Sequence, residues 1–153
     1  WKFSLGSVIA LIHDIIITLG FFSLIKMEFT MPVLAALMAV IGYSLNDTIV
    51  VFDRIRENFR RLRETSAADT INLSINQTLP RTILTSFTTL LVLFALYTYG
   101  GEALEGFAAT LIVGIVIGTY SSIFVASPLV LALGVQAHDL IIEEVEKEGA
   151  ELG

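Results

Sequence analysis

Residues 31–52 read MPVLAALMAVIGYSLNDTIVVF and contain a single charged side chain, Asp47. About 20 mainly apolar residues are what an α-helix needs to cross the hydrocarbon core of a bilayer. Pro32 stands in the first turn of this stretch, where a helix accepts proline without losing a hydrogen bond. The stretch therefore predicts a transmembrane helix that carries an acidic residue within it.

Three further apolar blocks flank this stretch, at about residues 5–25, 81–99 and 107–133. The 153-residue chain is 55% hydrophobic and 16% charged, whereas soluble domains carry about 25% charged residues. The charges are bunched between the blocks, while a soluble helical domain would need them along every helix. We therefore expect an all-α membrane protein in which residues 1–134 form a bundle of four transmembrane helices.

Two short polar links predict hairpins between antiparallel helices. Residues 26–30 are too few for any other connection, and Gly100 and Gly101 mark the second turn. The two links hold one Lys together, whereas the loop between the second and third blocks holds five Arg. Because basic residues concentrate in cytoplasmic loops, we expect the Arg-rich loop and both ends of the chain on the cytoplasmic side.

The cytoplasmic segment between the second and third blocks is expected to span residues 53–79. Its Arg-rich first part contains nothing that breaks a helix, so the second helix should continue out of the membrane. Ser66 with Asp69 resembles a capping box and would open a short amphipathic helix at the membrane surface. Pro80 then marks a kink or the fresh start of the third transmembrane helix.

Both ends of the chain carry their own expectations. The sequence opens at Trp1 without an initiator Met, which we interpret as a piece of a longer polypeptide. Residues 135–153 hold six acids and most of the net charge of −6. This pattern predicts a solvated acidic tail with no assigned partner.

No metal or cofactor chemistry is expected. The chain has no Cys, and its two His, His13 and His138, lie far apart in the sequence. Nothing in the sequence points to a nucleic acid.

Asp47, Arg81 and Asp14 are the candidate proton-pathway residues, because a charge at membrane depth is costly and is a functional hypothesis by default. At about 1.5 Å per residue, Asp47 lies about 24 Å below Met31 and Arg81 about 27 Å below Tyr99. The two fall at nearly one level, so a lateral ion pair is available. The pair is either a structural salt bridge or a titrating site, and its position in the membrane favours titration.

Polar side chains around this pair predict hydration. On the third helix, a hydroxyl stripe would run outward from Arg81, although such hydroxyls can simply bond the carbonyl four residues earlier. Asp14 is expected to face the interior, where it could join the Asp47 network, while its neighbour His13 points about 100° away. The supporting polar residues are Tyr43, Asn46, Thr48, Thr85, Thr88 and Thr89.

The fourth block carries small residues every four positions. Such a face lets two helix backbones approach closely. It serves either packing within this bundle or docking of another subunit, and Pro128 should bend or end the helix beyond it. The face consists of Gly106, Thr110, Gly114, Gly118, Ser122 and Ala126.

Residues 41–58, IGYSLNDTIVVFDRIREN, resemble the signature of the SecF branch of the SecD/SecF protein-export family, in the resistance-nodulation-division superfamily. The SecD branch has a related Arg-rich stretch but lacks the Asn-Asp-Thr wording. Shorter matches are His13-Asp14 and residues 77–83, 118–123 and 145–150, so the resemblance covers nearly the whole chain.

The resemblance implies transmembrane helices three to six of a SecF subunit, without the first two helices and the periplasmic domain. It implies a place in the bacterial inner membrane with SecD, beside the SecYEG channel, and YajC is a further candidate partner. There the proton-motive force would help to move preproteins. In that family, the residues matching Asp47 and Arg81 belong to the proton pathway; Pro80 departs from the usual residue before the Arg.

Three alternatives remain open. The chain could belong to another proton-driven exporter of the same superfamily, with a different periplasmic domain. It could be a scaffold that holds SecD and the channel together. An intramembrane protease built on Asp14 and Asp47 needs two carboxyls that share a proton, yet their estimated depths differ by about 7 Å.

Overall fold

The computed structural model describes residues 1–62 and 64–135, and this part of the chain is helical throughout apart from turns and links. The elements are α1 (Lys2–Ile25), α2 (Met31–Arg61), α3 (Ala67–Tyr99), α4 (Glu102–Ser121), a π-helical turn (Ser122–Ala126) and α5 (Ser127–Ala132). Four helices are long and apolar enough to cross a membrane, the last running from Glu102 to Ala132. The predicted all-α membrane bundle is confirmed.

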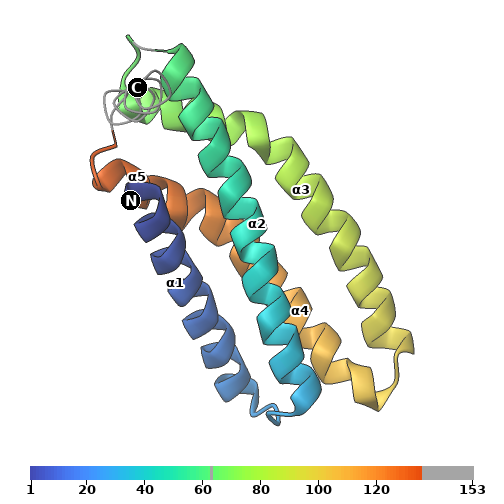
Figure 1. Cartoon of the computed structure of the whole chain (residues 1–153). Helices are drawn as coiled ribbons and strands as arrows, with labels where there is room; N and C mark the ends of the chain where they lie inside the picture. Colours follow the sequence, from blue (N-terminus) through green and yellow to red (C-terminus); the bar gives the residue numbers. More distant parts are fainter. Residues whose placement is uncertain (63, 136–153) are drawn as a thin grey trace, which may run out of the picture.

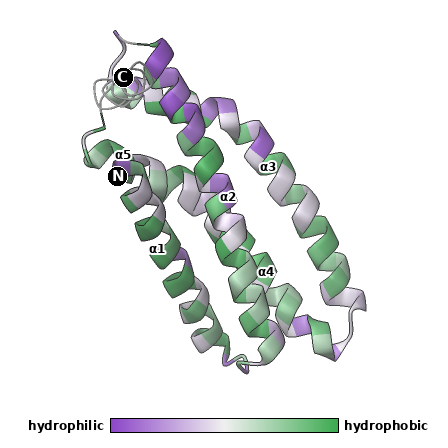
Figure 2. Ribbon diagram, in the orientation of Figure 1, coloured by the Kyte–Doolittle hydropathy of each residue, from purple (hydrophilic) through white to green (hydrophobic). Residues whose placement is uncertain are grey.

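The long helices lie side by side, with α4 behind α2, and both hairpin links lie at one end of the bundle (Figure 1). We call this the hairpin end. The opposite end holds the polar continuation of α2, which stands out against the apolar length of the bundle (Figure 2). We call it the basic end, because Arg54, Arg56, Arg60 and Arg61 lie there.

The third helix differs from the prediction. Residues 66–79 are not a separate helix at the membrane surface, since α3 runs unbroken from Ala67 to Tyr99 with Pro80 inside it. Ser66 does cap its start, accepting a hydrogen bond from the Asp69 N–H at 3.2 Å. Buried contacts on both sides of Pro80 hold the helix together, and membrane helices tolerate proline when neighbours compensate for the lost hydrogen bond.

The fourth span also has different bounds from those expected. It begins at Glu102 rather than near residue 107, directly after Gly101, whose φ of +74° suits glycine. Glu102 and Glu105 in its first turn favour this start, because acids stabilise the amino end of a helix. Ahead of Pro128 the helix widens into the π-helical turn, where the Ser127 hydroxyl donates to the Ser122 carbonyl at 3.1 Å.

Close packing of α4 on α2 sets the core of the bundle. A β-carbon added at Gly114 would collide with the side chain of Val40, so the two backbones approach as closely as glycine permits. One added at Gly118 would lie 3.2 Å from the β-carbon of Ser44. The small-residue face of α4 is therefore used inside this bundle.

Candidate functional site

Asp47 lies inside the bundle on α2. Its side chain is 4% exposed, and its Oδ2 atom has no hydrogen-bonding partner among the described residues. Thr48 beside it is buried, whereas Asn46 is exposed. One turn earlier, the hydroxyl of Tyr43 is also buried and without a partner in the described part of the chain. An apolar helix thus holds a carboxyl whose hydrogen-bonding capacity is not filled, which is costly and makes Asp47 a candidate functional residue.

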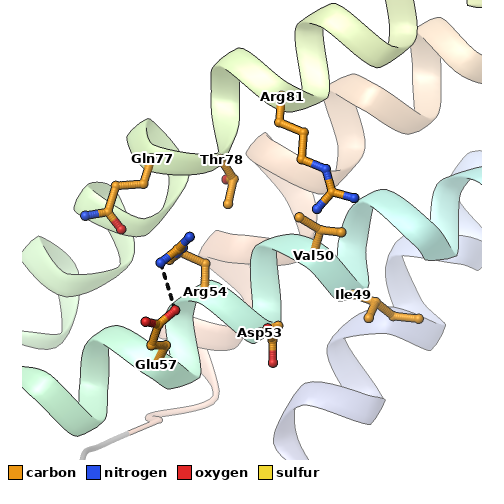
Figure 3. A pocket seen from close by; sticks show the side chains of 8 residues that line it. All are labelled: Ile49, Val50, Asp53, Arg54, Glu57, Gln77, Thr78 and Arg81. Carbon is orange, nitrogen blue, oxygen red and sulfur yellow. Dashed lines mark hydrogen bonds and ion pairs between the residues drawn. The ribbon is translucent and has the colours of Figure 1, made fainter.

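Arg81 approaches Asp47 from the neighbouring helix α3. The Arg81 charge acts on the Asp47 carboxyl electrostatically. The two side chains nevertheless form none of the ion pairs within 4.0 Å that the described residues make. In Figure 3 the Arg81 guanidinium reaches from α3 to Val50 of α2, one turn beyond Asp47. Asp47 and Arg81 therefore lie near the same level of the bundle without forming a salt bridge.

A pocket of about 240 Å³ opens between α2 and α3 on the basic-end side of this pair. Residues 49–57 of α2 and 77–81 of α3 contribute its lining, and Arg81 forms its inner boundary. Within it, Arg54 donates a hydrogen bond of 2.8 Å to Glu57, drawn as a dashed line in Figure 3. A pocket lined mostly by polar and charged residues thus extends from Glu57 to the Arg81 side chain.

The hydroxyl stripe predicted beyond Arg81 lies on the outward face of α3. Thr85 donates to the Arg81 carbonyl, Thr88 to the Leu84 carbonyl and Thr89 to the Thr85 carbonyl, at 2.8–3.0 Å. These hydroxyls are therefore satisfied by their own helix. Their contribution to a water path stays a prediction.

A second row of hydroxyls on α3, which was not predicted from the sequence, faces the interior. All its members are buried and recur every four residues. At its inner end the Ser86 hydroxyl hydrogen-bonds the Thr119 hydroxyl of α4 at 2.7 Å. The row consists of Thr70, Ser74, Thr78, Thr82 and Ser86.

Asn58 joins this row to α2 and was not predicted either. It is 4% exposed and donates through Nδ2 to the Ser74 hydroxyl at 2.8 Å and to Gln77 Oε1 at 2.9 Å. These bonds tie the basic end of α2 to α3 about two turns before Arg81. A single Asn in an Arg-rich strip gives no sequence signal of this kind, because polar residues are expected there.

Asp14 faces the interior as expected and is fully buried. Its Oδ1 atom lies 3.1 Å from His13 Nδ1, and the Ser44 hydroxyl of α2 donates to its Oδ2 at 2.5 Å. Ser44 stands one turn before Asp47 on the same helix. Asp14 is thus linked to the α2 turn next to Asp47, with both carboxylate oxygens engaged elsewhere.

The predicted packing residues of α4 contact α2. Gly106 lies against Val33, and the Ser122 hydroxyl donates to the carbonyl of Thr119 in its own helix at 2.9 Å. No group of three metal-ligating side chains occurs within residues 1–62 and 64–135. The predicted acidic tail falls, except for Val135, outside the described residues.

Comparison with known proteins places this chain in one family. The family "Protein export membrane protein SecD/SecF, C-terminal" matches residues 1–136. "Protein translocase subunit SecF" of Vibrio alginolyticus is 58% identical over 99% of this chain and 48% of its own length. The subunit of the same name from Escherichia coli O157:H7 is 54% identical over 99% of this chain and 47% of its own length.

A solved structure agrees with the sequence comparisons. The "Crystal structure of SecDF in Super-membrane-facing form" superposes with a TM-score of 0.84 at 48% identity, covering 96% of this chain and 20% of that one. The chain spans about half the length of the relatives it matches. On the family match and these identities, the chain belongs to the SecD/SecF protein-export membrane family.

Proposed function

We propose that this chain is the transmembrane part of a SecF-like subunit that, with SecD, uses the proton-motive force to assist preprotein translocation through the SecYEG channel. The names of the relatives support a role in export, and the likeness to the SecDF crystal structure supports a partnership with SecD. The preprotein would be handled by a periplasmic domain outside this chain. The proposal makes the chain a translocation subunit of the bacterial inner membrane rather than an enzyme.

The observation that carries the proton-coupled part is the buried carboxyl of Asp47 with an unfilled hydrogen-bonding site and an open Arg81 nearby. A carboxyl in low dielectric favours its neutral form, and a nearby cation favours the carboxylate. When Asp47 is ionised, Arg81 is drawn towards it; when Asp47 takes up a proton, Arg81 is released. The exchange of one proton thus changes the force between α2 and α3.

The pocket between α2 and α3 supports access from one side of the membrane. Most of its lining side chains are polar or charged, it reaches Arg81, and it extends towards the basic end as far as Glu57. The excess of Arg at that end supports a cytoplasmic position for it by the positive-inside rule, with both ends of this chain proposed on the same side. A proton leaving Asp47 would then pass Arg81 and enter water through this pocket.

Asp14 has a supporting part in this proposal. Through Ser44 it fixes the rotation of α2 one turn before Asp47, so that the Asp47 carboxyl stays directed into the bundle. Because its oxygens contact His13 and Ser44, it is not set up to share a proton with Asp47 as a protease dyad would require.

Substitution of Asp47 in the full-length protein tests the proposal. Asp47→Asn removes the titrating proton but keeps the side-chain volume. Glu64→Gln is the control, because Glu64 is an exposed acid that does not line the pocket between α2 and α3. With SecD and the channel present, we expect Asp47→Asn to abolish the stimulation of preprotein release by the proton-motive force, and Glu64→Gln to retain it.

Wild-type stimulation in an assembled Asp47→Asn complex would overturn the proposal and leave a non-titrating scaffold. If the proton-motive force does not stimulate preprotein release even in the wild type, the other candidate, a proton-driven exporter of the same superfamily, replaces it. Sequencing upstream of Trp1 identifies the periplasmic domain and separates these two.

A further inference from the structure

The packing register between α2 and α4 places Ser121 opposite Asp47. The two helices run in the same direction, and each interface glycine of α4 lies 73 or 74 residues after the α2 residue that it touches. Ser121 follows Asp47 by the same 74 positions. The contacts that set this register are Gly106 with Val33, Gly114 with Val40 and Gly118 with Ser44.

Both facing side chains are buried and incompletely hydrogen-bonded. Ser121 is fully buried and Asp47 is 4% exposed. The Ser121 hydroxyl and the Asp47 Oδ2 atom are two of the three buried side-chain polar atoms without a partner in the described part of the chain, Tyr43 supplying the third. Buried polar groups are otherwise almost always paired, so two such groups at one level of one interface point to a common partner or to each other.

The neighbouring Ser122 shows that serine hydroxyls in this part of the helix are not generally left without a partner. Ser122 is equally buried, yet its hydroxyl donates to the Thr119 carbonyl of its own helix. A buried serine in a membrane helix normally satisfies itself in this way. Ser121 does not, and its hydroxyl is left available on the face that meets α2.

The backbone next to Ser121 is itself unusual. The π-helical turn Ser122–Ala126 begins with the following residue. Such turns are rare inside helices and occur often at functional sites, because the wider turn changes the direction of the side chains around it. The irregularity therefore coincides with the level of Asp47.

We propose that Ser121 is the hydrogen-bonding partner of Asp47 across the α2–α4 interface, donating to its carboxylate through one bridging water and so stabilising the ionised state. The titratable groups nearest this level are Tyr43 on α2, Arg81 on α3 and Asp14 on α1, which contacts Ser44 one turn before Asp47. The acids of α4, Glu102 and Glu105, lie at the hairpin end. Ser121 is thus a positioning residue. Its consequence for export rests on the proposed function.

The protonation of Asp47 can be read without transport. Dicyclohexylcarbodiimide reacts with protonated carboxyls in apolar surroundings, and labelling of the full-length protein with SecD in liposomes is followed across pH. Asp47→Asn gives the background. We expect Ser121→Ala to move the labelling midpoint upward by about one pH unit, since a hydrogen bond to a charged group contributes on that order. Ser121→Thr, which keeps a hydroxyl, should restore the wild-type midpoint.

Ser122→Ala is the matched control, because it removes an equally buried hydroxyl that its own helix already satisfies. Its midpoint should stay within about 0.2 pH unit of wild type, the scatter of a group that makes no contact with the charge. If Ser121→Ala does not assemble, Ser121→Cys replaces it, since a thiol is a weaker donor of similar size. An unchanged midpoint in the Ser121 variant that assembles overturns this inference alone. Absence of titrating label in the wild type overturns the proposed function as well.

Discussion

Ser44 of α2 donates a hydrogen bond of 2.5 Å to the fully buried carboxyl of Asp14 on α1. This bond joins the first helix to the second by a polar contact inside the apolar bundle. The other oxygen of the same carboxyl contacts His13 of α1. Ser44 also faces Gly118 of α4 and stands one turn before Asp47. Three helices therefore meet around a single serine next to the proposed proton site.

Replacing Ser44 with Ala should destabilise the assembled protein by about 2 kcal/mol, because a buried carboxyl loses its donor and keeps its desolvation cost. The midpoint of unfolding in detergent measures the change. Ser7→Ala is the control, since the Ser7 hydroxyl donates only to the Phe3 carbonyl of its own helix. That variant should lie within about 0.5 kcal/mol of wild type. Equal effects of the two substitutions would contradict a structural role for the Ser44–Asp14 contact.

Gly114→Ala should destabilise the bundle by about 1–3 kcal/mol, because the added methyl collides with Val40 and overpacking forces the helices apart. A β-carbon at Gly42 meets nothing within 4 Å, so Gly42→Ala serves as the control for helix propensity. It should leave stability unchanged or raise it by up to about 1 kcal/mol. Unfolding midpoints of the two variants are compared in the same detergent; a neutral Gly114→Ala would show that α4 and α2 are not in close contact.

Asn58→Ala should loosen the basic end of α2 from α3. Two hydrogen bonds to Ser74 and Gln77 are lost, and we expect a cost of about 2 kcal/mol in stability. Hydrogen exchange of the backbone amides in residues 67–79 reports the local opening. The control Asn72→Ala changes an exposed asparagine of α3 and should leave the exchange rates of residues 67–79 unchanged. Faster exchange in both variants, or in neither, would contradict the conclusion that Asn58 holds the basic end of α2 to α3.

Proton-driven activity should depend on the positive charge at position 81 more than on the shape of the arginine side chain. Because it forms no ion pair within 4.0 Å with Asp47, Arg81→Lys keeps a cation near the carboxyl and is expected to retain a reduced but measurable proton-driven activity. Arg81→Gln removes the charge and should reduce that activity to the level of the Asp47→Asn variant. The comparison is made by preprotein release with and without an uncoupler. Full activity of Arg81→Gln would exclude the pair as the coupling element.

The transmembrane fold could be predicted because apolar length and bunched charges are local signals. The course of α3 could not, since Pro80 is a local signal for interruption. The contact that holds residues 67–79 against α2 is a tertiary one, made by Asn58 on the neighbouring helix. Which hydroxyls of α3 face the interior was ambiguous for a related reason. Hydroxyls recur every four residues in an outer row with Thr85 and an inner row with Ser86, and this offset of one position turns the helix by about 100°.

Only part of the candidate site could be predicted from the sequence. A lone acid in an apolar block identifies Asp47, and depth counting brings Arg81 to its level. Ser121 gave no signal because serine is common on small-residue faces. Its relation to Asp47 appears only when the glycine contacts fix the register between α2 and α4.

Proton flux through the purified full-length complex tests the proton-coupled role of Asp47 most directly. The complex is placed in liposomes that contain a pH-sensitive dye, a potential is applied, and the rate of internal pH change is recorded for the wild type, Asp47→Asn and Glu64→Gln. We expect wild type and Glu64→Gln to conduct protons at similar rates and Asp47→Asn to fall to the rate of protein-free liposomes. Conduction by Asp47→Asn at the wild-type rate would contradict a proton pathway through this carboxyl.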